Sequence, residues 1–393
     1  MKKKYFYLTL FFALCCIFVP YGRVNAYAAQ DESVNDKLNE EIDLVIEDID
    51  LSELENYISD ISDLLSDKSS LKNLLLNFMK GQGIEEYDNA LNYIFGLLIN
   101  GLKSKLPVFI SLFALLILCS IVNALSSERS CGVKDVMNFI GFAVIAGTVT
   151  TISVSLIYNA KDACDKVGKM IQIIFPLLLT LITVSGGVTQ AAVYSPTTLF
   201  LGNFITVFVS GIMFPMVITM LVLNVVSNIS KKIKLKGFID FLSSFMKWGI
   251  GLAGVTFSIF LSVKGLNAGA FDGLSVKTLK YALSSTVPIV GGVVGGGAEI
   301  MLAAVALTKN ALGTLSVLLV FGIVIKPVIE IASLVLALRL VNAVAQPLSG
   351  DNAYSFINSC VSVLNYAFAG LMLVSLMYSS TIIILLLSAR VML

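Results

Sequence analysis

The chain of 393 residues is 57% apolar and only 13% charged, with a net charge of +1. Ordinary soluble domains carry about 25% charged residues, so the composition excludes a typical soluble enzyme and indicates a membrane protein with several spans. The charge is unevenly divided, because residues 31–88 hold 17 acidic residues and 4 lysines, whereas the rest holds 23 basic and 9 acidic residues. An acidic soluble segment is therefore attached to a basic, apolar body.

The N-terminus has the three parts of a secretory signal peptide. Three lysines precede an apolar run over residues 5–19, and a small-residue Ala-x-Ala sequence follows at 26–28. The run is shorter than the roughly 20 residues that a spanning helix needs. We therefore predict a signal peptide over residues 1–28, cleaved after Ala28, with an uncleaved anchor as the alternative. In both cases the acidic segment lies outside the cytoplasm.

Residues 29–105 have the pattern of an acidic helical domain. Apolar residues recur at steps of three and four between acidic ones, at Leu51, Leu54, Ile58, Ile61 and Leu65. This stripe is interpreted as the inner face of a small extracytoplasmic domain, and the alternative is a face that binds a partner protein.

Eight apolar runs follow the acidic domain. They cover residues 106–125, 136–158, 170–188, 199–226, 241–263, 287–307, 312–344 and 361–388. The first two, within 106–158, are long enough to span a membrane and carry charges only at their ends.

The remaining runs form an internal repeat. Pro176 and Pro288 lie 112 residues apart, and Gly211 and Gly322 lie 111 apart. Other landmarks keep the same order and nearly the same spacing, which predicts a duplicated unit of three segments over residues 166–263 and 277–387.

The first segment of each unit has a proline followed by glycines. These residues are Pro176, Gly186 and Gly187 in the first unit, and Pro288, Gly291, Gly292, Gly295, Gly296 and Gly297 in the second. Paired Gly/Pro interruptions in two halves point to a pathway at the repeat interface. The alternative is a small-residue face for close helix packing. A phosphate loop is excluded, because there is no Walker sequence and no soluble strand–helix context.

The lysine cluster at residues 231–236 bears on the topology. If all eight runs cross, this cluster falls outside the cytoplasm, against the positive-inside rule. If the two Gly-rich segments are re-entrant or broken, six spans remain and the cluster is cytoplasmic. The lysines favour six spans.

The chain contains no histidine, which removes Ser-His and Cys-His nucleophile pairs and histidine zinc sites. We therefore predict no catalytic site, metal or cofactor. Glu299 and Glu330 are the two acidic residues expected at membrane depth, where ionisable groups are functional candidates. Lys309 and Lys326 are possible partners, so an ion pair of purely structural role is the alternative.

The order of these features resembles the stage III sporulation protein AE family of endospore-forming bacteria. The resemblance rests on the signal peptide, the acidic helical segment, PLLLTLITVSGG followed by VTQAAVYSP, and the later VPIVGGVVGGGAE. It implies a permease-like component of the sporulation stage III A complex, made in the mother cell and placed in the membrane around the forespore. With a forespore-made partner, that complex forms a secretion-like channel needed for late forespore gene expression.

The sequence thus predicts an all-α polytopic membrane protein with an N-terminal extracytoplasmic helical domain and an internally duplicated core. Its expected partners are the other proteins of the complex, the forespore-made channel partner and membrane lipid, and not nucleic acid. One alternative is a stand-alone secondary transporter with a site at the Gly-rich segments near Glu299. Another is a scaffold whose membrane part only anchors the acidic domain.

Overall fold

The structure is a computed structural model that describes residues 40–45, 52–61, 75, 87–125, 131–185, 187, 191–192, 202–229, 235–267, 291–348 and 351–388. Across these ranges the regular elements are helices and none is a strand, which confirms the predicted all-α class. The signal peptide with its cleavage residue Ala28 lies outside the described residues, as does much of the acidic segment.

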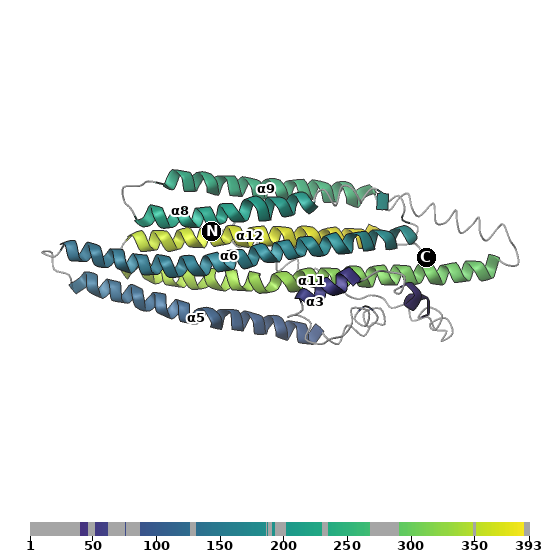
Figure 1. Ribbon diagram of the computed structural model, residues 1–393, viewed down its shortest axis with the longest axis horizontal. Coiled ribbons are helices and arrows are strands. Elements are labelled where there is room, and N and C mark those ends of the chain that lie inside the picture. Colours follow the sequence, from purple (N-terminus) through teal and green to yellow (C-terminus); the bar gives the residue numbers. More distant parts are fainter. Residues whose placement is uncertain are drawn as a thin grey trace.

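Six long helical segments run back and forth along a common axis (Figure 1). They are α5 (Tyr87–Leu125), α6 (Cys131–Val184), η2 (Val207–Met213) continued by α8 (Phe214–Ile229), α9 (Lys236–Asn267), α11 (Gly291–Leu348) and α12 (Asp351–Ser388). Each segment contains a stretch long and apolar enough to cross a membrane. The expectation of a multi-span membrane protein is therefore confirmed on length and composition.

Two of these helices are longer than the sequence predicts. α6 has 54 residues and α11 has 58, so at 1.5 Å per residue they are about 80 and 87 Å long, whereas a bilayer core is about 30 Å thick. α6 joins the apolar run 136–158 to most of the run 170–188, and α11 joins the described part of the run 287–307 to the run 312–344. Eight predicted runs thus become six helical segments by fusion.

The fusion has a local cause in each helix. The charged stretch of α6 between its two apolar runs contains no proline or glycine pair, and Asp162 and Lys166 form an ion pair of 2.8 Å at helical (i, i+4) spacing. In α11 the corresponding polar stretch is short, at Lys309 and Asn310, and also lacks a helix breaker. Charge alone ends an apolar run but does not end a helix.

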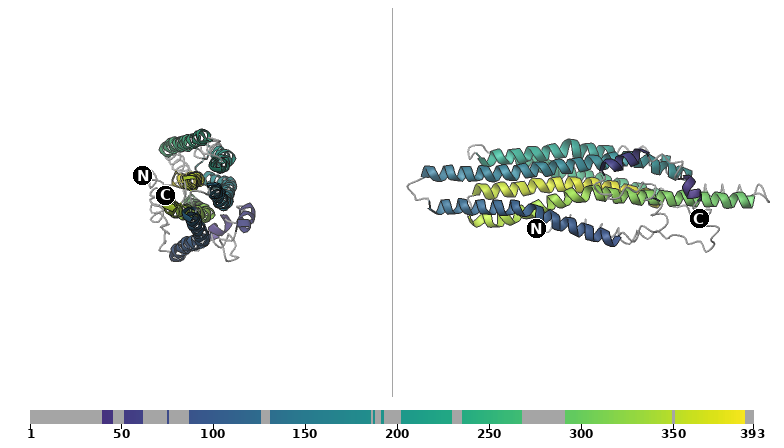
Figure 2. Two further views of the ribbon diagram at one scale, coloured as in Figure 1. Left: turned by 90° about the vertical axis from the view of Figure 1, so that its left-hand side faces the viewer. Right: turned by 60° about the horizontal axis from the view of Figure 1, so that its bottom comes forward.

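The two ends of the bundle differ in charge. α5, α8 and α11 end, and α6, α9 and α12 begin, at one end of the bundle, on the left in Figure 1. In the sequence the residues between these helix ends include Glu128 and Arg129, whose charges cancel, and the three lysines Lys231, Lys232 and Lys234. The described N-terminal helix α3 (Ser52–Ile61) lies along the half of α6 nearer the opposite end (Figures 1 and 2). The end at which α6, α9 and α12 begin is therefore the basic end.

The core lies where α6, α11 and α12 pack together, as the end-on view in Figure 2 shows. Phe142 of α6 meets Phe356 of α12 edge to face, with ring centroids 5.5 Å apart. α11 and α12 approach so closely at Gly313 that a Cβ added there would collide with the Leu386 side chain. A side chain at this position would require Leu386 to move, so the glycine favours the close approach of the two helices.

The two predicted repeat units are built differently in the structure. The first comprises the end of α6, the η2–α8 segment and α9, while the second comprises only α11 and α12. α9 lies at one edge of the bundle, whereas α12, its counterpart, lies in the middle (Figure 2). The duplication therefore stays a prediction from sequence. The predicted domain boundary at residue 105 falls inside α5, which runs without interruption through Pro107.

Candidate functional site

A polar contact in the apolar bundle lies where α6, η2 and α12 meet. We call this contact, formed by Gly168, Gly202, Thr206 and Tyr378, the π-helix junction. The Tyr378 hydroxyl donates to the Gly202 carbonyl oxygen over 2.9 Å. Because that bond uses its only proton, the Thr206 hydroxyl 2.5 Å away donates to Tyr378. A Cβ added at Gly168 would lie 2.9 Å from the Thr206 methyl group, so α6 and η2 are in direct contact.

The π-helix itself follows from Pro215. Proline has no backbone N–H to continue an α-helical ladder, and its ring collides with the carbonyl one turn earlier. The preceding turns widen into η2, in which the Phe214 N–H bonds the Val209 carbonyl five residues back. Ser210, in the middle of η2, is buried, and its hydroxyl has no hydrogen-bond partner. Single π-turns of this kind are often found at functional sites in helices.

The first predicted Gly-rich interruption coincides with the end of a helix. α6 ends at Val184, and the Gly187 N–H bonds the Ile182 carbonyl over 2.9 Å, which is the six-to-one bond of a Schellman C-cap. The Gly187 carbonyl accepts from the Ala191 N–H at the start of another helical turn. Gly186 lies outside the described residues. Pro176 lies inside α6, which continues past it.

The second Gly-rich stretch forms the first turns of a helix. Gly291, Gly292, Gly295, Gly296 and Gly297 all belong to the start of α11, and Glu299 follows on the same helix. Pro288 and the side chain of Glu299 lie outside what the structure describes. The pathway role predicted for these residues therefore stays a prediction.

The charged residues of α11 lie in three different surroundings. Glu330 is half-buried and accepts a hydrogen bond of 3.4 Å from the Asn159 side chain of α6. Lys326, one turn earlier, is exposed, whereas Lys309 is almost fully buried. Asn159 is the first residue of the charged stretch of α6. The Glu330 carboxylate of α11 therefore lies beside that charged stretch.

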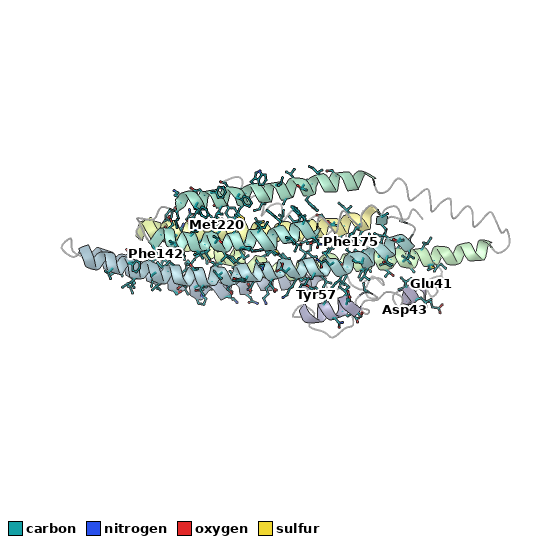
Figure 3. All side chains as sticks on the ribbon, turned by 45° about the horizontal axis from the view of Figure 1, so that its top comes forward. Glu41, Asp43, Tyr57, Phe142, Phe175 and Met220 are labelled. Carbon is teal, nitrogen blue, oxygen red and sulfur yellow. The ribbon has the colours of Figure 1, made fainter. Side chains whose placement is uncertain are left out.

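The helix α3 docks on the same charged stretch of α6. The Tyr57 hydroxyl donates to the Lys166 carbonyl over 2.6 Å, and Leu54 is buried. Burial, together with the nearby Asp162 carboxylate, raises the pKa of Tyr57 to about 12. Figure 3 shows Tyr57 on the side of α3 that faces the bundle. One part of the acidic N-terminal segment is thus attached to the membrane bundle.

The described part of the chain contains no group of three or more His, Cys, Asp or Glu side chains that could hold a metal. Sequence reasoning missed the π-helix junction, although Pro215 with Gly211 was a signal for an interrupted helix. Nothing local to Thr206 indicates its contact with Tyr378, 172 residues later.

Comparison with known proteins identifies the family. The sequence model of stage III sporulation protein AE matches residues 69–389, most of the chain. The chain belongs to the stage III sporulation protein AE family. As a member of this family it is 28% identical over 322 residues to the stage III sporulation protein AE of Bacillus subtilis (strain 168), covering 80% of each chain. No solved structure matches it. Membership of the stage III sporulation protein AE family indicates involvement in sporulation, as the sequence resemblance implied.

Proposed function

We propose that the chain is the permease-like membrane component of the sporulation stage III A complex. This complex forms a secretion-like channel between mother cell and forespore and is required for late forespore gene expression. The observation that carries the proposal is the family match over residues 69–389, which includes all six helical segments of membrane-spanning length. The chain acts through protein partners rather than through an enzymatic site.

The charge of the bundle supports one orientation for this component. The basic end faces the mother-cell cytoplasm, following the positive-inside rule. The opposite half, with α3 docked at Lys166, faces the space between the mother-cell and forespore membranes. Six crossings place the start of α5 and the end of α12 on that same side. The acidic segment before α5 is then available to the basic surfaces of partner proteins.

The experiment that tests this proposal removes the acidic segment and keeps the bundle. A chain that lacks residues 31–84 is produced in the native host in place of the intact chain. The deletion stops before α5, which begins at Tyr87. We expect normal membrane abundance, loss of co-isolation with the other proteins of the complex, and loss of late forespore gene expression. Full complementation by the shortened chain would contradict the proposal.

A second candidate function is a stand-alone secondary transporter. The observation in its favour is the π-helix beside Pro215, together with the buried hydroxyl of Ser210 that has no hydrogen-bond partner. Such a transporter needs no partners, so the shortened chain keeps its full activity. The deletion above therefore separates the two functions.

A further inference from the structure

The outward face of α9 carries a row of large apolar side chains that the other described helices do not cover. The row steps alternately by three and four residues through Phe238, Phe241, Phe245, Trp248, Leu252, Val255 and Ile259. These side chains are between 38% and 64% exposed. In Figures 1 and 2 α9 lies at the edge of the bundle, with its neighbours α8 and α12 on one side only.

The spacing of this row is that of a coiled-coil seam. A repeat of seven residues keeps a stripe facing a partner helix in a left-handed supercoil. The inward face of α9 follows the same spacing over only part of its length, because its buried positions are Leu242, Met246, Gly249, Ala253 and then Phe257. The outward face keeps the sevenfold repeat without interruption from Phe238 to Ile259.

Small residues on α9 recur at the same spacing of seven residues. Gly237, Ser244, Gly251 and Ser258 are each seven residues apart and are exposed beside the large apolar row. A Cβ added at Gly237 or Gly251 would meet no atom of the chain within 4 Å. These glycines are thus not required for packing inside the protein, whereas small residues at this spacing let a second helix approach closely.

Lipid alone does not suit this face. Lys247 and Trp248 are exposed in the first half of α9, and the candidate span that contains them has a mean hydropathy of 1.2, the lowest of the six segments. A lysine at the centre of a lipid-facing helix is costly, and tryptophan is enriched at membrane interfaces rather than in the hydrocarbon region. A helix packed on this face shields Trp248 from the hydrocarbon region.

We propose that this face, which we call the α9 seam, binds the α9 seam of a second copy of the same chain in a parallel pair. All copies insert in one orientation, so two seams are in register over their whole length. Each seam has a row of large apolar residues beside a row of small residues. The large residues of one copy can therefore pack against the small residues of the other. The seven large side chains expose roughly 750 Å² per chain, taking about 200 Å² for a full aromatic side chain.

This exposed area is the most that the pair can bury with these side chains, and it is close to the roughly 800 Å² per partner of a standard protein interface. A two-fold pair of this kind is the commonest symmetric assembly of identical chains. The contact goes beyond the proposed function and does not depend on it, because it concerns only the neighbour of α9.

Cysteine cross-linking in membranes tests the pair. The native cysteines are replaced, and single cysteines are introduced by Ser244→Cys, Ser258→Cys and, as a control, Thr151→Cys. Ser258 and Thr151 are both exposed, and each hydroxyl bonds the carbonyl four residues back, at 2.8 and 2.9 Å. We expect disulfide-linked dimers at 244 and 258 at least about tenfold more abundant than at 151, a ratio that corresponds to about 1.4 kcal/mol.

A second pair of variants tests the close approach. Gly251→Leu in the Ser258→Cys protein should lower the dimer yield about tenfold. Gly147→Leu in the same protein should leave it unchanged, because Gly147 on α6 is also exposed and a Cβ there meets no atom within 4 Å. Equal dimer yields at 151 and 258, adducts only with a polypeptide of another mass, or a yield insensitive to Gly251→Leu would each overturn the proposal.

Discussion

The π-helix junction gives the sharpest energetic prediction, which concerns the hydroxyl pair of Thr206 and Tyr378. Tyr378→Phe removes one accepted and one donated hydrogen bond, of 2.5 and 2.9 Å. Each such bond contributes about 0.5–1.5 kcal/mol net, so we expect the free energy of unfolding to fall by about 1–3 kcal/mol. Thr206→Val keeps the shape of the side chain, removes one of the two bonds and should cost about 1 kcal/mol.

The double variant isolates the contact itself. Coupling energies of interhelical hydrogen bonds in membrane proteins average about 0.6 kcal/mol, with a maximum of about 1.7, and the hydroxyl pair of Thr206 and Tyr378 is a bond of this kind. We therefore expect a coupling of about 1 kcal/mol between Thr206→Val and Tyr378→Phe. The assay is reversible unfolding in mixed micelles with increasing sodium dodecyl sulfate, followed by circular dichroism.

A second tyrosine of α12 serves as the matched control. The Tyr366 hydroxyl donates to the Ser243 carbonyl over 3.5 Å, a bond too long to be strong. Tyr366→Phe should therefore cost less than about 0.5 kcal/mol. If Tyr378→Phe costs no more than Tyr366→Phe, and the coupling with Thr206→Val is below about 0.2 kcal/mol, the account of the junction is wrong.

Three further predictions concern other parts of the chain. The pKa of Tyr57 is raised from 10 to about 12 when α3 is docked, so ionisation of Tyr57 favours the released form of α3. Docking should be constant below pH 10 and weaken as the pH rises from 10 to about 12. The distance between spin labels at Glu53 and Lys169 should increase over that range, and Tyr57→Phe should abolish this pH dependence. Gly313→Leu should lower the free energy of unfolding by about 1–3 kcal/mol, in the same micelle assay, because Leu386 occupies the space; an unchanged midpoint would show that α11 and α12 accommodate a side chain there without cost. Glu299→Gln should reduce sporulation at unchanged membrane abundance, and wild-type spore counts would remove this residue from any pathway.

The sequence predicted the helical class and the apolar segments because both depend on local composition. The number of helices was harder to predict, because a helix that leaves the bilayer continues if nothing breaks it. The charged stretch around Asp162 and Lys166 marks a boundary in polarity, but its ion pair stabilises the helix. At Gly187, by contrast, the predicted interruption and the end of α6 coincide, because a glycine pair favours a C-cap.

The site was less predictable, since its contacts join distant residues. Thr206 and Tyr378 are each ordinary in a membrane segment, and only packing brings them together. Lys309 was expected as a partner for an intramembrane carboxylate, and its near-complete burial depends on the surrounding helices. The N-terminal stripe is partly explained, because its residue Leu54 is buried on α3, which docks on α6.

The proposed role in the sporulation channel is tested most directly by late forespore gene expression in the native host. Fluorescent reporters for early and late forespore genes are followed in cells that lack this chain and in cells that carry it again. The account predicts that loss of the chain abolishes the late signal, leaves the early signal unchanged, and is reversed by the intact chain. A late signal that persists at the normal level without the chain would contradict the account.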